Sequence, residues 1–199
     1  TNSANMFAPR LPSSSSLRGG GVEQVGPEGE GHGLGKMEIF WQCAPCAACI
    51  FVTIFASVVV FPFYTFVPSG NAQFSMVLFY TKIFSDTISR PITTKLNCLQ
   101  SPHLLLVAAL LRLGICVPLF FLYISGLIPP NDLGFSMAIA VFSFLSGYLV
   151  TSAFQLAPET VPHKYRCVVA NMCSVAFQTA FAAALLLALV IRAVLFPDP

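Results

Sequence analysis

Residues 168–196 read VVANMCSVAFQTAFAAALLLALVIRAVLF, and this stretch decides the class of fold. It exceeds the roughly 20 apolar residues that a helix needs to cross a bilayer, and Arg192 is its one charged residue. Four further apolar stretches precede it. Because the lipid core cannot satisfy open backbone groups, each crossing must be helical. The sequence therefore predicts an all-α membrane protein with five transmembrane helices, at about Ile39–Val67, Phe74–Ile92, Leu104–Ile128, Phe135–Leu156 and Val168–Phe196.

The overall composition agrees with lipid as the solvent. Apolar types make up 56% of the residues and charged types only 9%, whereas soluble domains carry about a quarter charged residues. A net charge of +2 is too small to suggest a nucleic-acid partner. Residues 1–36 are rich in Ser, Gly, Pro and Glu and predict a disordered linker, followed by a bundle over 37–196. Since the chain starts at Thr1 without a signal peptide, we expect a piece of something longer.

Positive charge is distributed unevenly among the predicted loops. The segment before the first helix and the second and fourth loops hold basic residues, whereas the first and third hold no Lys or Arg. Basic loops stay in the cytoplasm, so we expect the N-terminus inside and the C-terminus outside. Arg192, near the outer end, can snorkel. The residues that set this orientation are Lys36, Arg90, Lys95, His103, His163, Lys164 and Arg166.

Besides Arg192, near the end of the last stretch, four charged side chains fall inside the apolar stretches. Lys82, Asp86 and Arg90 are spaced four apart and share one helical face, and Arg112 lies in the next helix. A charge at the bilayer centre costs roughly 3 kcal/mol or more, so these groups need partners or water. We predict that Asp86 can pair with Arg112, in competition with Lys82 and Arg90. A structural pin between two helices and a role in transport both stay open.

Uncharged polar side chains form one stripe on each of the last two predicted helices. The stripes are Tyr148, Ser152 and Gln155 on the fourth, and Asn171, Ser174 and Gln178 on the fifth. Their spacing places each set on one face. Such stripes line aqueous cavities or join helices by hydrogen bonds, and both interpretations remain.

Signals for metal or enzyme chemistry are weak. Cys43, Cys46 and Cys49 form C-x-x-C-x-x-C, but the further Cys-Pro of an iron–sulfur run is missing. The histidines are scattered among loops, and Asp86 is the one acid inside a helix. We therefore expect no metal, no other cofactor and no enzymatic activity.

Five motifs, in order, resemble the equilibrative nucleoside transporters. The main one is Phe84–Arg90, which holds the family's Asp-x-x-x-Arg signature, although Ser89 replaces the usual Gly. The likeness covers about residues 38–195. The other motifs are Phe61-Pro62, Leu111-Arg112-Leu113 with Val117-Pro118, Phe142-x-Phe144-x-x-Gly147-Tyr148-Leu149, and Ala157-Pro158 with Ala170-x-Met172.

This resemblance implies the C-terminal half of an eleven-helix, major-facilitator-like fold. Six helices would precede Thr1, and residues 1–36 would belong to the central cytoplasmic loop. The family moves nucleosides, and sometimes nucleobases, by alternating access between two bundles. Asp86 and Arg90 take the places of its acidic and basic pair, which is tied to substrate handling and gating.

The resulting hypothesis is nucleoside or nucleobase transport by a multi-pass protein of the plasma membrane or an organelle membrane. Its expected partners are the substrate, the bilayer and the missing six-helix half. The alternatives are another carrier or channel subunit, and a non-transporting assembly protein. The candidate binding or gating residues are Lys82, Asp86, Arg90, Arg112, Tyr148, Gln155, Asn171 and Gln178.

Overall fold

The computed structural model describes residues 36–95, 101–129 and 131–195. The chain divides into two units, Thr1–Gly33 and Leu34–Pro199, and the described helices belong to the second. The predicted linker over residues 1–36 lies outside the described residues, except for the backbone of Lys36. Cys98, in the connection that follows the second helix, also lies outside them.

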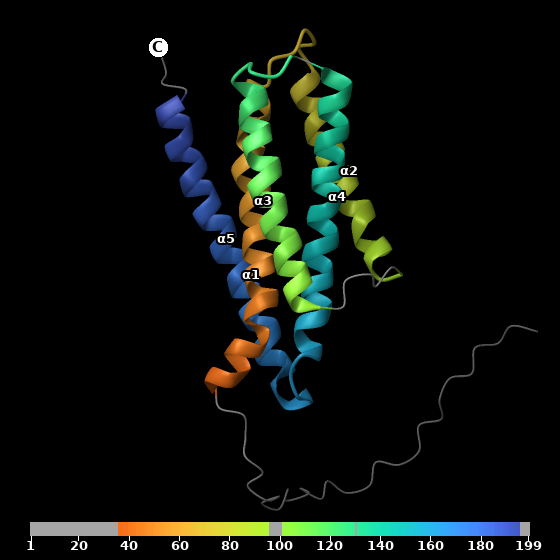
Figure 1. The fold of residues 1–199 in the computed structure, drawn as a ribbon, viewed down its shortest axis with the longest axis vertical. Helices are drawn as coiled ribbons and strands as arrows, with labels where there is room; N and C mark the ends of the chain where they lie inside the picture. The colour runs from red at the N-terminus through yellow and green to blue at the C-terminus, as the bar shows by residue number, and fades with distance from the viewer. Residues whose placement is uncertain (1–35, 96–100, 130, 196–199) are drawn as a thin grey trace, which may run out of the picture. The chain divides into compact units, whose positions relative to one another are not determined.

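In the part of the chain that the structure describes, the second unit contains five α-helices and no strand (Figure 1). The all-α prediction is therefore confirmed. The α-helices are α1 (Lys36–Val60), α2 (Phe74–Thr93), α3 (Pro102–Ile124), α4 (Asp132–Leu156) and α5 (Arg166–Leu195). Short 3₁₀ segments are η1 (Phe61–Phe66), η2 (Ala157–Glu159) and η3 (His163–Tyr165).

Among the described residues, four helical segments are long and apolar enough to cross a membrane: Met37–Phe66, Pro102–Ile124, Asp132–Glu159 and His163–Val194. The expectation of several membrane-crossing helices is thus supported for these four. With 20 residues, α2 is long enough to cross a membrane, but it contains three charged side chains. Its crossing of the membrane remains a prediction.

The ends of the helices follow local chemistry. Four of them begin two or three residues before the predicted apolar stretch, because polar residues and proline start helices well. Asn131 caps α4 by accepting a hydrogen bond from the Gly134 amide at 3.0 Å, and Pro102 opens α3. Pro62 has no amide hydrogen for an α-helical bond, and the first membrane segment continues there as the 3₁₀ turn η1.

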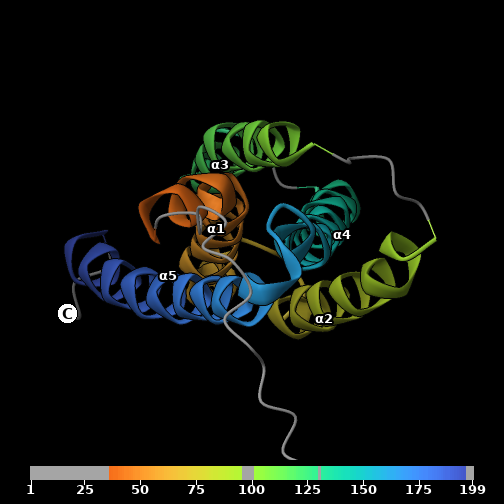
Figure 2. The same ribbon diagram turned by 90° about the horizontal axis from the view of Figure 1, so that it is seen from below.

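α1 and α4 form the middle of the bundle. α1 packs against α3, α4 and α5, while α4 packs most extensively against α2. In Figure 2, α3 lies on one side of α1 and α4, and α5 and α2 lie on the other. One core cluster joins α1, α3, α4, η2 and α5, and a second joins α1, η1, α2, α3, α4 and α5.

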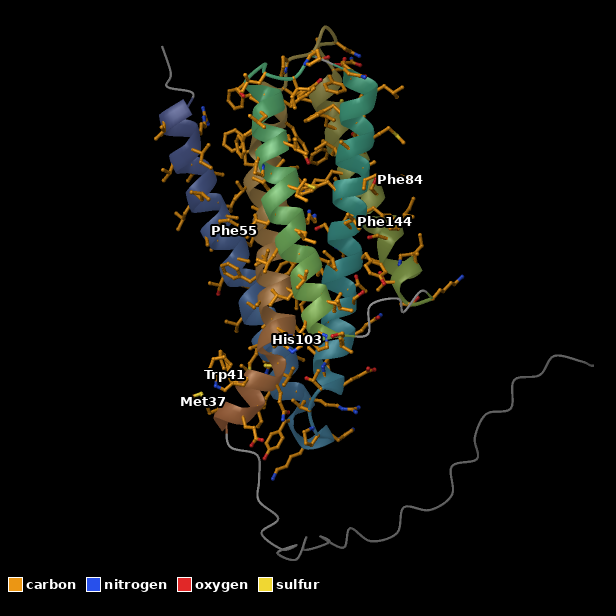
Figure 3. The ribbon with its side chains drawn as sticks, in the orientation of Figure 1. Met37, Trp41, Phe55, Phe84, His103 and Phe144 are labelled. Carbon is orange, nitrogen blue, oxygen red and sulfur yellow. The ribbon has the colours of Figure 1, made fainter. Side chains whose placement is uncertain are left out.

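The basic loop residues gather at one end of the bundle. α1, α3 and α5 start at this end, where Figure 3 shows Met37, Trp41 and His103. His163 and Lys164 lie in η3, directly before α5. The fold thus places at one end of the bundle the basic residues that the charge rule assigns to the cytoplasm.

Candidate functional site

Asp86 forms an ion pair with Arg90 on the same helix. An Arg90 guanidinium nitrogen donates to an Asp86 carboxylate oxygen at 2.8 Å. The side chains are 28% (Asp86) and 61% (Arg90) exposed, so this pair lies at the surface of the described bundle. Within the described ranges it is the one ion pair. Of the three predicted cationic partners, Asp86 therefore pairs with Arg90. The predicted pair between Asp86 and Arg112 is wrong.

Arg112 instead lies in the interior, with 4% of its surface exposed. Its Nε donates to the Phe142 carbonyl at 3.1 Å, and its two terminal nitrogens donate to the Thr53 carbonyl at 3.0 Å and the Ser57 hydroxyl at 2.7 Å. The guanidinium carbon also lies 3.8 Å from the centroid of the Phe142 ring. Arg112, on α3, thus joins α1 and α4.

These contacts link α3 to α1 and α4, and not to α2 as the predicted Asp86–Arg112 pair would have done. A planar guanidinium offers five N–H donors in a fixed fork, and neutral acceptors from two other helices take up three of its nitrogens. The Ser57 hydroxyl lies 2.8 Å from the Ser146 hydroxyl and extends the network within α1 and α4. Two of the acceptors are backbone carbonyls, which every residue has, so the sequence contained no signal for them.

α2 comes very close to α4 at Gly147. A Cβ atom placed on Gly147 would lie 2.6 Å from the Asp86 carbonyl oxygen and 2.9 Å from its carboxylate oxygen, and it would collide with the Ser89 hydroxyl. The Ser89 hydroxyl donates to the Asp86 carbonyl at 2.7 Å. The resemblance implies a Gly at position 89, and here the missing side chain on the facing helix makes room for the serine.

Lys82 contacts an aromatic ring of η1 rather than a carboxylate. Its ammonium nitrogen lies 4.1 Å from the centroid of the Phe61 ring, a cation–π contact. Asp86 and Arg112 lie within electrostatic range of Lys82, but the Asp86 carboxylate pairs with Arg90. Lys82 thus shares a helical face with Asp86 and a contact with the first membrane segment.

A hollow of about 260 Å³ opens between η1 and the start of α2. Phe61 forms part of its wall, and the ring of Phe79 lies 5.5 Å from that of Phe61, centroid to centroid. Three of its seven lining residues are aromatic, and the hollow adjoins the ring that Lys82 covers. Its lining residues are Phe61, Pro62, Tyr64, Thr65, Ser75, Met76 and Phe79.

The polar stripe on α4 lies on a different face from the Asp86 contact. Ser146 contacts α1 through Ser57, and Gly147 contacts α2. Tyr148, the next residue along α4, is partly buried. It packs against the core cluster that α1, α3, α4 and α5 share, and Gln155 is exposed.

The polar stripe on α5 faces outward. The residues of α5 that are buried against the bundle are Val169, Cys173, Ala180, Ala184 and Ala188. Asn171 and Gln178 are exposed on the opposite side, and the Ser174 hydroxyl bonds to its own helix at the Ala170 carbonyl. The candidate residues are therefore divided: Lys82, Asp86 and Arg90 lie together, Arg112 lies in the core, and the stripes lie elsewhere.

No protein-family model, curated protein or solved structure matches this chain. The likeness to nucleoside transporters therefore rests on the five sequence motifs. Sequence reasoning missed the residues that support the site: Ser57, Ser146 and Gly147. Gly147 belongs to one of the five motifs, but only its close contact with Ser89 on α2 explains why a glycine is needed there.

Proposed function

We propose that this chain is the C-terminal half of a membrane carrier that moves nucleosides or nucleobases by alternating access. The observation that supports this best is the exposed Asp86–Arg90 pair on α2, which has the length of a membrane span and packs against the membrane-length helix α4. An ion pair in or near lipid is expensive, and a surface pair adds little stability. Such a pair is better explained by contact with a polar solute than by folding.

The chemistry of the pair suits a nucleoside. A carboxylate accepts hydrogen bonds from ribose hydroxyls, and a guanidinium donates to oxygen or nitrogen acceptors on a base. Aromatic rings stack on bases, and Phe61 and Phe79 lie near the same face of α2. The Asp86–Arg90 bond would open when the solute takes its place, which links occupancy to the position of α2.

Arg112 acts in this proposal as a positioning residue. Its hydrogen bonds connect α1 to α4, and α4 in turn holds α2 at Gly147. Rigid helices around the charged pair keep it in one geometry until a solute binds. A six-helix partner half would cover the exposed side of the pair, with the N-terminus in the cytoplasm and the C-terminus outside.

Uptake measurements test the proposal. Cells that lack their own nucleoside uptake would express the complete protein and receive labelled adenosine, uridine and hypoxanthine. We expect saturable uptake of at least one of them, and at least a tenfold loss in Asp86→Asn, because the amide cannot accept two hydroxyl bonds with full charge.

Glu159→Gln is the matched control, since it makes the same chemical change at an exposed acid in η2. It should transport like the unaltered protein. A well-expressed, correctly targeted protein that takes up none of the three compounds would contradict the proposal and favour a channel subunit or an assembly protein. Normal uptake by Asp86→Asn would remove Asp86 from the mechanism.

A further inference from the structure

A cavity of about 300 Å³ lies between α3 and α4. Residues of α3 between Cys116 and Tyr123 form one wall, and residues of α4 between Gly134 and Phe142 form the other. Val60 of α1 also lines it. Both walls therefore belong to helices that are long and apolar enough to cross a membrane.

The lining of this cavity is apolar except at one end. Besides the Cys116 thiol, its polar side-chain groups are those of Asn131 and Tyr123. The Asn131 backbone amide donates to the Tyr123 hydroxyl at 3.0 Å, where α3 has ended and α4 begins. A buried water needs two to four polar partners, and an apolar cavity stays dry. The body of the cavity is therefore suited to hydrocarbon and not to water.

The rim of the cavity lies at the surface of the bundle. Leu119 on α3 is 50% exposed, and Ala138 on α4 is also exposed. Between Leu104 and Leu122, every exposed residue of α3 is apolar or glycine, whereas α5 exposes Asn171 and Gln178. Figure 2 shows α3 on the side of α1 and α4 away from α2 and α5. The cavity thus opens beside the helix whose outer surface suits lipid best.

The depth of the cavity matches one leaflet of a bilayer. Phe142 lies ten residues after Asp132, or roughly 15 Å along α4 from the start of the helix. The hydrocarbon core of a bilayer is about 30 Å thick. The cavity therefore extends from the polar end, at Asn131 and Tyr123, to about the middle of the membrane. This is the depth that an acyl chain occupies below its head group.

We propose that this cavity binds one acyl chain of a membrane phospholipid. The chain enters between Leu119 and Ala138 and lies along the walls, with the head group toward Asn131. An empty cavity would leave the lining atoms without dispersion contacts on one side, and the neighbouring lipid supplies the hydrocarbon that restores them. Because the chain comes from lipid and not from water, packing rather than the hydrophobic effect holds it. The inference does not depend on nucleoside transport.

Photocrosslinking tests the inference. The complete protein would be placed in phosphatidylcholine nanodiscs that contain phosphatidylcholine with a diazirine in its acyl chain, and adducts would be mapped by peptide mass spectrometry. We expect adducts on Phe120 and Ile139, which line the cavity but are each only 4% exposed. Lipid that merely surrounds the bundle would label exposed residues such as Leu110 and Leu111 instead.

Ala138→Phe should fill the cavity from its rim. Adducts on Phe120 and Ile139 should fall at least about fivefold, because a closely packed interior leaves no space for both ring and chain. Cys116→Phe makes the same change from the α3 wall, and it keeps the test valid if Ala138→Phe does not fold.

Ala182→Phe is the matched control, since Ala182 is equally exposed to the surroundings on α5 but lies away from the cavity. It should leave the adducts unchanged. Adducts confined to exposed residues, or undiminished adducts in a folded Ala138→Phe or Cys116→Phe protein, would overturn the inference. An equal loss in Ala182→Phe would do so too. Nucleoside uptake can succeed or fail independently of these outcomes.

Discussion

Substitution of Gly147 by alanine tests the close contact that holds Asp86 in place. The added Cβ would lie 2.6 Å from the Asp86 carbonyl oxygen. The Ser89 hydroxyl and the Asp86 carboxylate can rotate away, but a backbone carbonyl cannot. α2 must therefore separate from α4, and the hydrogen bond from Ser89 to the Asp86 carbonyl must adjust.

Two opposing contributions set the magnitude. Alanine is favoured over glycine inside a helix by about 1 kcal/mol, whereas overpacking of a tight contact costs about 1–3 kcal/mol. Gly114→Ala serves as the reference for the helix preference alone, because Gly114 also lies inside a helix and a Cβ there meets nothing within 4 Å. The helix preference is common to both variants. Their difference in free energy of unfolding is thus the packing cost, about 1–3 kcal/mol.

The assay is equilibrium unfolding of the complete protein in mixed micelles, followed by circular dichroism. Gly114→Ala should be as stable as the unaltered protein or more so, and Gly147→Ala should be less stable than Gly114→Ala. Because the clash displaces Asp86, Gly147→Ala should also reduce nucleoside uptake. If both variants unfold at the same free energy, α2 and α4 are not in close contact at this glycine.

Two further predictions concern the interior. Arg112→Lys retains the charge but not the planar fork, so at least one acceptor among its three partners loses its bond; we expect a loss of about 2 kcal/mol in unfolding free energy. Asp86→Asn should change the free energy of unfolding by less than about 1 kcal/mol, since the Asp86–Arg90 pair is exposed. An equal loss in the Arg112→Lys and Asp86→Asn variants would indicate that Asp86 and Arg112 interact after all. A water-soluble maleimide should label Cys167, which is exposed, but not Cys46, which is fully buried, as measured by peptide mass spectrometry; labelling of Cys46 in the folded protein would contradict the packing of α1.

The four strongly apolar helices were readable from the chain alone. Their length and apolar character are local properties, and lipid permits no other backbone structure for such stretches. The start of α4 at Asp132, three residues before the predicted Phe135, also has a local cause, because Asn131 caps the helix. Charge spacing similarly placed Lys82, Asp86 and Arg90 on one face, since four residues make about one helical turn.

Which helix faces which was decided only by the tertiary structure. Opposite charge made Arg112 and Asp86 the expected partners, but Arg112 donates hydrogen bonds to backbone carbonyls of α1 and α4 instead. Those acceptors exist at every position, so only their arrangement in space distinguishes them. The match between Gly147 and Ser89 likewise joins residues far apart in the chain. Sequence determines where apolar helices form, because that depends on neighbours along the chain; partner choice depends on neighbours across the bundle.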